Sequence, residues 1–97
     1  MTARVMVFAT VKPGDEEAFE SAFARVRRTV AGTPGHRGDQ LLRDPHEPGA
    51  YILLSEWEST AAFLAWEDAP VHREATTPMR PYWSGPVTRR IFEVAAG

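Results

Sequence analysis

The chain has no cysteine among its 97 residues, and this absence removes several kinds of chemistry. Disulfides, thiolate nucleophiles and thiolate metal sites are all excluded. A concentrated positive charge is also lacking, because the formal net charge is −2 and the isoelectric point lies near 5.9. Binding to nucleic acid requires a clustered basic surface. We therefore expect no nucleic-acid partner.

Long apolar segments are missing as well. No apolar run approaches the ~18 residues that a membrane-spanning helix needs, and the N-terminus lacks the apolar segment of a secretion signal. We expect a cytoplasmic protein with no membrane partner. The composition, 43% hydrophobic and 25% charged, is typical of a globular protein, and the length fits one domain over residues 1–97.

Several functional motifs are absent too. No glycine-rich loop joins a strand to a helix in the way that a phosphate-binding loop does, and no Gly-x-Ser-x-Gly sequence is present. The three histidines, His36, His46 and His72, have no metal-ligand spacing. We therefore expect no metal site and no flavin or nicotinamide cofactor.

The first half of the chain has one clear strand pattern and one clear helix pattern. Residues Arg4–Val11 form an almost continuous apolar and β-branched run, typical of a buried strand. The acidic triplet Asp15–Glu17 favours the first turn of a helix, which Gly32 and Pro34 end. The apolar residues between them repeat on one helix face: Phe19, Ala22, Phe23, Val26 and Val30.

The second half of the chain has the patterns of two strands, two helical segments and a final strand. A turn cluster over Asp44–Gly49 separates a strand over Gly35–Asp44 from a strand over Tyr51–Trp57, which predicts an antiparallel hairpin. Ser59 is a plausible N-cap for a helix over residues 60–67, and Pro70 suits the first turn of another that reaches about Met79. A final strand is predicted over Val87–Val94.

The predicted order is therefore β-α-β-β-α-β with a broken second helix. This order is the ferredoxin-like α+β fold, a four-stranded antiparallel sheet with helices on one face. The other face of such a sheet stays uncovered, so an apolar second face predicts a partner. Pairing of two sheets in a homodimer would cover it.

Residues 50–73 place two indoles and an imidazole near one interface between helix and sheet. Trp66 follows Phe63 by three residues, so it faces the sheet and either packs in the core or lines a pocket. Trp57 ends a strand, where it serves the core, a dimer contact or a pocket. His72 is the best general base by residue type, since a near-neutral pKa suits proton abstraction.

The loop Met79–Gly85 is rich in aromatic residues. Arg80 and Tyr82 are candidates to donate hydrogen bonds to a substrate oxyanion, with Trp83 beside them. The alternative is a rigid connector whose aromatic rings close one end of the fold. His36, at the start of the second strand, lies near the predicted pocket mouth, whereas His46 lies in the exposed hairpin turn.

Several segments together resemble the antibiotic biosynthesis monooxygenase superfamily, whose members are dimeric α+β barrels. The resemblance covers essentially the whole chain. It is carried by four segments: Val11-Lys12-Pro13-Gly14, Pro34-Gly35, Ser55-Glu56-Trp57-Glu58-Ser59 with Ala62-Phe63-Leu64-Ala65-Trp66, and Pro70-Val71-His72-Arg73. It implies a cofactor-independent monooxygenase acting on a small aromatic or polyketide-type substrate in an apolar pocket. The alternatives are a non-oxidative cyclase or isomerase on the same scaffold, and a protein that binds haem or another apolar ligand without catalysis.

The resemblance also guides the choice of site residues. The predicted catalytic residues are His72, Trp66, Arg80 and Tyr82. The predicted substrate contacts are Trp57, Phe63, Trp83, His36 and Thr10. The haem-degrading branch of the superfamily uses an asparagine on the first strand and a histidine about ten residues after the tryptophan. Here Val7 and Thr10 stand on the first strand and Thr76 follows Trp66 by ten, which disfavours haem.

Overall fold

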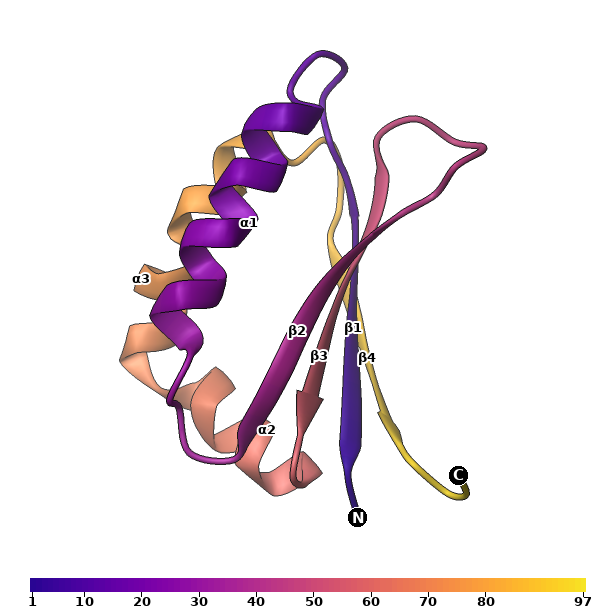
Figure 1. The fold of residues 1–97 in the computed structure, drawn as a ribbon. Helices are drawn as coiled ribbons and strands as arrows, with labels where there is room; N and C mark the ends of the chain where they lie inside the picture. The colour runs from indigo at the N-terminus through magenta and orange to yellow at the C-terminus, as the bar shows by residue number, and fades with distance from the viewer.

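The computed structural model describes all 97 residues and has the predicted ferredoxin-like order of strands and helices (Figure 1). The elements are β1 (Ala3–Thr10), α1 (Glu16–Val30), β2 (His36–Arg43), β3 (Ala50–Trp57), α2 (Thr60–Asp68), α3 (Pro70–Thr76), the 3₁₀ helix η1 (Thr77–Tyr82) and β4 (Thr88–Glu93). The strands form one antiparallel sheet in the order β2-β3-β1-β4. The α+β fold predicted from the sequence is confirmed.

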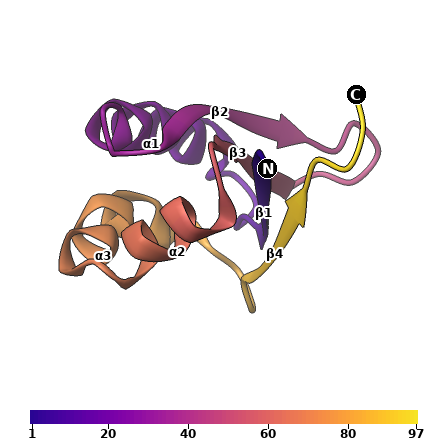
Figure 2. The same ribbon diagram turned by 90° about the horizontal axis from the view of Figure 1, so that it is seen from below.

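All helices lie on one face of this sheet (Figure 2). The α1 helix covers one part of the face, and α2 and α3 cover the other part. None of the helices combines the length and the apolarity needed to cross a membrane. The arrangement leaves the opposite face of the sheet without helices.

The helix boundaries follow from local chemistry. Ser59 caps α2, because its hydroxyl oxygen accepts a hydrogen bond from the Ala62 amide at 3.1 Å. Pro70 lies in the first turn of α3, where its missing N–H costs nothing. The sequence predicted that this helix would reach Met79, but α3 ends at Thr76 and the chain tightens into η1. Pro78 explains the change, since proline disrupts α-helical hydrogen bonding to the preceding turn.

The entry to β2 depends on Gly35. Its φ of +83° is favourable only for glycine, and a Cβ at this position would lie 2.5 Å from the Cβ of Ala62. The Gly35 carbonyl also accepts a hydrogen bond from the Glu58 amide at 2.8 Å. The start of β2 is therefore held against the start of α2.

The core lies between the helices and the sheet. The buried face of α1 consists of four residues: Phe19, Ala22, Val26 and Val30. Alternate residues of a strand point to the same face, so Ala3, Val5 and Ala9 of β1 point toward the helices. The largest completely buried side chain is Trp57, at the end of β3.

The even-numbered residues of β1 and β3 face away from the helices. Met6 and Phe8 pair with the middle of β3, and Phe8 lies opposite Ile52. Leu42 of β2 and Phe92 of β4 extend this apolar surface, and each is 40% exposed. We call Met6, Phe8, Leu42, Ile52 and Phe92 the open sheet face.

Tyr51 of β3 connects the sheet to α1. Its hydroxyl donates a hydrogen bond of 2.6 Å to the Glu20 carboxylate, and its ring packs on Phe19 with centroids 5.1 Å apart. Burial, followed by the hydrogen bond to Glu20, raises the pKa of Tyr51 to about 12. The folded protein thus keeps Tyr51 protonated at a pH where the unfolded chain ionises it.

The raised pKa of Tyr51 predicts a loss of stability at high pH. Its stabilising contribution is fully present below about pH 10 and disappears as the pH rises toward 12. The free energy of unfolding should fall by up to ~3 kcal/mol from this group. Urea titrations at several pH values would measure the fall. The variant Tyr51→Phe should lack this component, and an equal fall in that variant would contradict the assignment.

Candidate functional site

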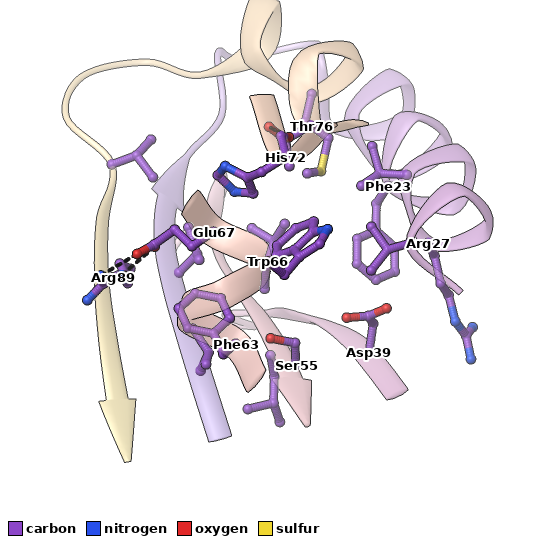
Figure 3. Close-up of a pocket in the computed structure, with 18 of the residues that line it drawn as sticks. Phe23, Arg27, Asp39, Ser55, Phe63, Trp66, Glu67, His72, Thr76 and Arg89 are labelled. Carbon is purple, nitrogen blue, oxygen red and sulfur yellow. Dashed lines mark hydrogen bonds and ion pairs between the residues drawn. The ribbon is translucent and has the colours of Figure 1, made fainter. Parts of the chain in front are cut away.

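A cavity of about 300 Å³ lies between the helices and the sheet (Figure 3). Phe23 and Val26 of α1 form one wall, and Val5, Val7 and Leu53 of the sheet form the floor. Phe63 and Trp66 of α2, His72 and Thr76 of α3, and Met79 and Arg80 of η1 form the other wall. A largely apolar cavity with a few polar side chains is the usual form of a small-molecule site, and its volume lies at the small end of such sites.

A row of aromatic rings runs along this cavity. The ring centroids of His72 and Trp66 are 4.5 Å apart, with the rings nearly perpendicular. Trp66 then contacts Trp57 at 5.5 Å, and Trp57 contacts His36 at 5.1 Å. Such tilted and edge-to-face contacts are favourable for aromatic rings. The row places an imidazole at each end of a pair of indoles.

His72 is a half-buried histidine on the first turn of α3. Burial lowers its pKa, the positive charge of Arg80 lowers it further, and the negative charge of Glu67 opposes both effects. The imidazole is therefore neutral at neutral pH. A neutral imidazole in an apolar cavity can accept a proton from a bound molecule.

Glu67 and Arg89 form an ion pair between α2 and β4. The Arg89 Nε and Nη2 atoms donate hydrogen bonds of 2.7 and 2.6 Å to the two carboxylate oxygens of Glu67. These hydrogen bonds hold the pKa of Glu67 below its usual range, against the effect of burial. Glu67 is thus an anion that is already paired, so its main effect on His72 is electrostatic.

Arg80 and Trp83 bring two buried donors to the cavity. Arg80 donates from Nη2 to the Thr76 hydroxyl at 3.0 Å, and its guanidinium carbon lies 5.4 Å from the centroid of the Trp83 ring. The Arg80 Nε and the Trp83 Nε1 are both buried without a hydrogen-bond partner. Buried donors without a partner are costly, so each of these nitrogen atoms is a candidate donor to a bound molecule.

The loop that carries Trp83 is fixed to the end of β1. The Lys12 amide donates to the Tyr82 carbonyl at 3.0 Å, and the Ser84 amide donates to the Thr10 carbonyl at 2.7 Å. These hydrogen bonds hold the indole of Trp83 in the wall of the cavity. The loop is therefore both a firm connector and a part of the site.

Six of the nine residues proposed from the sequence line the cavity: Trp57, Phe63, Trp66, His72, Arg80 and Trp83. Tyr82 packs instead against the buried cluster that contains Phe19. Thr10 is an exposed, even-numbered residue of β1, and the even-numbered residues face away from the helices. His36 stands behind the cavity wall, against Trp57.

Six polar residues of the cavity wall were not proposed from the sequence: Arg27, Asp39, Ser55, Glu67, Thr76 and Arg89. Glu67 follows Phe63 by four residues, so helical periodicity places it on the same face and was a usable signal. Arg89 lies two residues before Ile91, which packs against the buried cluster that contains Trp57. Alternation along β4 therefore places Arg89 on the same face of the sheet. No cluster of three or more histidine, aspartate or glutamate side chains has the arrangement of a metal site.

The fold and the cavity define a class of protein, namely small α+β domains that enclose an apolar pocket between their helices and a four-stranded sheet. Comparison with known proteins identifies the family. The family model for antibiotic biosynthesis monooxygenases matches residues 2–77. The chain belongs to the antibiotic biosynthesis monooxygenase family, as its sequence predicted.

Curated relatives include proteins from Streptomyces. The 42.8 kDa protein in the whiE locus of Streptomyces coelicolor is 40% identical over 76 residues, and Protein SchA of Streptomyces halstedii is 35% identical over 82 residues. These matches cover 78% and 84% of this chain but only 19% and 22% of the relatives, so the chain spans about a fifth of their length. A mycobilin-producing heme oxygenase of Mycobacterium tuberculosis is 37% identical over 60 residues, which cover 62% of this chain and 57% of that enzyme.

Solved structures share the fold. A monooxygenase-family structure from Bordetella bronchiseptica superposes with a TM-score of 0.88 at 20% identity and covers 98% of both chains. SnoaB, a cofactor-independent oxygenase from Streptomyces nogalater, superposes with a TM-score of 0.79 at 24% identity. That match covers 99% of this chain and 94% of SnoaB. At these identities the likeness concerns the fold alone.

Proposed function

We propose that this protein is a cofactor-independent monooxygenase that acts on an aromatic, polyketide-type molecule. The observation that carries the proposal is the combination of a neutral imidazole and two unpartnered buried donors around one apolar cavity. Family membership supports the same function, and SnoaB, which shares the fold, is a cofactor-independent oxygenase. The aromatic, polyketide-type substrate is what the resemblance of the sequence to this family implies.

In this proposal, His72 acts as the base. It removes a proton from an acidic CH₂ group beside the aromatic rings of the substrate, and the resulting anion places its charge on an oxygen. Arg80 Nε and Trp83 Nε1 would donate hydrogen bonds to this oxygen, and preorganised donors stabilise such charge strongly. The apolar walls exclude water and hold the rings flat against Trp66.

Oxygen then reacts with the bound anion. One electron passes from the anion to O₂, and the two radicals combine to form a hydroperoxide on the same carbon. Loss of water leaves a carbonyl group there. One oxygen atom ends in the product and the other in water, while the two hydrogens of the CH₂ group also leave in that water. The substrate supplies all the electrons, so the reaction requires no reductant.

Oxygen uptake tests the proposal. Purified protein treated with a chelator would be mixed with anthrone, and O₂ consumption and formation of anthraquinone would be followed together. Equal amounts of O₂ consumed and anthraquinone formed, above the rate without protein and unchanged by added haemin, would support it. Rearrangement of the substrate without O₂ uptake would overturn oxygenation in favour of a non-oxidative cyclase or isomerase, and activity that required haemin would overturn the cofactor-independent mechanism.

We also propose that the protein is a homodimer paired through the open sheet face. An apolar surface of this kind is unfavourable in water unless it is covered. Sedimentation equilibrium should therefore give about twice the chain mass of 10.8 kDa. The variant Phe8→Glu should be monomeric, whereas Leu64→Glu, on an exposed part of α2, should not change the mass. A monomeric wild-type protein would contradict the proposal.

A further inference from the structure

The strand β2 contains an irregularity that changes the direction of one side chain. His36 pairs with Trp57, but Gly38, two residues later, pairs with Glu56, the very next position of β3. Arg37 is thus an extra residue, which makes this a β-bulge. In a regular strand, residues three apart point to opposite faces. The bulge brings both His36 and Asp39 to the face that carries the helices.

His36 and Asp39 form a buried pair there. The His36 Nε2 lies 2.9 Å from the Asp39 Oδ2, and the side chains are only 7% and 13% exposed. The two atoms lack the alignment of a hydrogen bond, and both are buried without any hydrogen-bond partner. The contact with His36 holds the Oδ2 atom of Asp39 in place and leaves the other carboxylate oxygen available to accept a hydrogen bond.

Asp39 also reaches the cavity. It lines the wall together with Ser55, and the two residues lie directly opposite each other in the pairing of β2 with β3. The Ser55 hydroxyl oxygen accepts a hydrogen bond from the Trp57 indole at 2.9 Å, so the Ser55 proton is free to be donated. A carboxylate acceptor and a hydroxyl donor side by side are complementary to a hydroxyl group.

This polar end of the cavity lies away from His72. Trp66 and Trp57 stand between His72 and His36 in the aromatic row, and Figure 3 draws Asp39 and Ser55 on the far side of Trp66 from His72. We propose that Asp39, positioned by His36, binds a second hydroxyl group of the substrate. The cavity then selects flat aromatic molecules with oxygen groups at both ends. This inference rests on the proposed function for the aromatic class of the substrate.

Two probes with the same ring system test the selection. They are 2-naphthol and 2,6-dihydroxynaphthalene, which differ only in the second hydroxyl at the far end of the rings. Calorimetric titration should show that the wild-type protein binds the diol at least about tenfold more tightly, as one hydrogen bond to a charged group provides. Asp39→Ala should reduce this preference to about onefold and leave the affinity for 2-naphthol nearly unchanged.

Three further variants separate positioning from structure. His36→Gln should reduce the preference partly, because the carboxylate remains but loses the imidazole that positions it. His72→Ala, at the other end, should leave the preference unchanged while it abolishes most oxygen uptake. Asp68→Ala, which removes an exposed carboxylate at the end of α2, is the matched control and should resemble wild type.

Several outcomes would overturn the inference. They are equal wild-type affinity for both probes, binding of neither probe, and an equal loss of both affinities in Asp39→Ala, which would show that the pair only stabilises the bulge. The proposed function fails independently, through oxygen uptake. A preserved diol preference without any oxygenation would leave Asp39 as a recognition residue of a different reaction.

Discussion

Replacement of His72 by alanine should lower the turnover of anthrone by a factor of about 10²–10⁴, the usual contribution of a positioned general base. The effect should fall mainly on kcat, since the apolar walls and the donors Arg80 and Trp83 remain to bind the substrate. Oxygen consumption measured over a range of anthrone concentrations gives kcat and KM separately.

The neighbouring residue offers a control for this substitution. Val71 lies on the same turn of α3 but is 50% exposed, so Val71→Ala should keep wild-type kcat and nearly wild-type stability. A kcat of His72→Ala within a factor of about three of the wild type would place the base elsewhere and refute this role for His72. A rise in KM with an unchanged kcat would assign His72 to binding alone.

The lowered pKa of His72 also predicts the pH dependence of the reaction. The imidazole becomes protonated in the folded protein only below its ordinary pKa of 6.5, so activity should persist through pH 6.5 and decline at lower pH. The free energy of unfolding should also decrease as the pH falls below this range. The unfolded chain binds this proton first as the pH falls, so the stabilising contribution is present above pH 6.5 and is lost below it. Glu67→Gln removes a charge that raises this pKa, and should therefore shift the decline in activity to still lower pH.

Much of this site follows from periodicity in the sequence. Phe63 and Trp66 lie three residues apart on a capped helix, so their common direction toward the sheet could be predicted from spacing alone. The order of the strands and helices follows from turn residues and apolar patterns in the same way. The predicted end of the second helical segment was wrong because the proline-rich turn after Thr76 favours a tighter helix.

Other features of the site depend on details that no pattern records. His36 shares a face with Asp39 because of a bulge at Arg37, and nothing in the sequence of β2 marks where pairing shifts by one residue. Thr10 was expected to contact the substrate, but it is an even-numbered residue of β1. The alternation of side chains along the strand turns it to the face away from the helices. The direction of Tyr82 depends on the packing of η1 against α1, which arises only from the complete fold.

Trp57 connects the stability of the fold with the shape of the site. It is completely buried, yet it lines the cavity and stands between Trp66 and His36 in the aromatic row. Its indole nitrogen also donates a hydrogen bond to the hydroxyl oxygen of Ser55. A residue with these contacts cannot be altered without an effect on both properties.

Trp57→Ala should therefore lower the free energy of unfolding by about 3–5 kcal/mol, because it removes a large buried ring and leaves a void beside an existing cavity. That loss is a large part of the total stability of about 5–15 kcal/mol that small domains have. Urea unfolding followed by circular dichroism measures it without depending on the lost indole. Trp57→Phe keeps a ring against Phe63 and Trp66 but removes the hydrogen bond to Ser55, so its loss should be smaller. A loss below about 1 kcal/mol in Trp57→Ala would show that the helices close over the vacated space, which the close approach of Ala62 to Gly35 opposes.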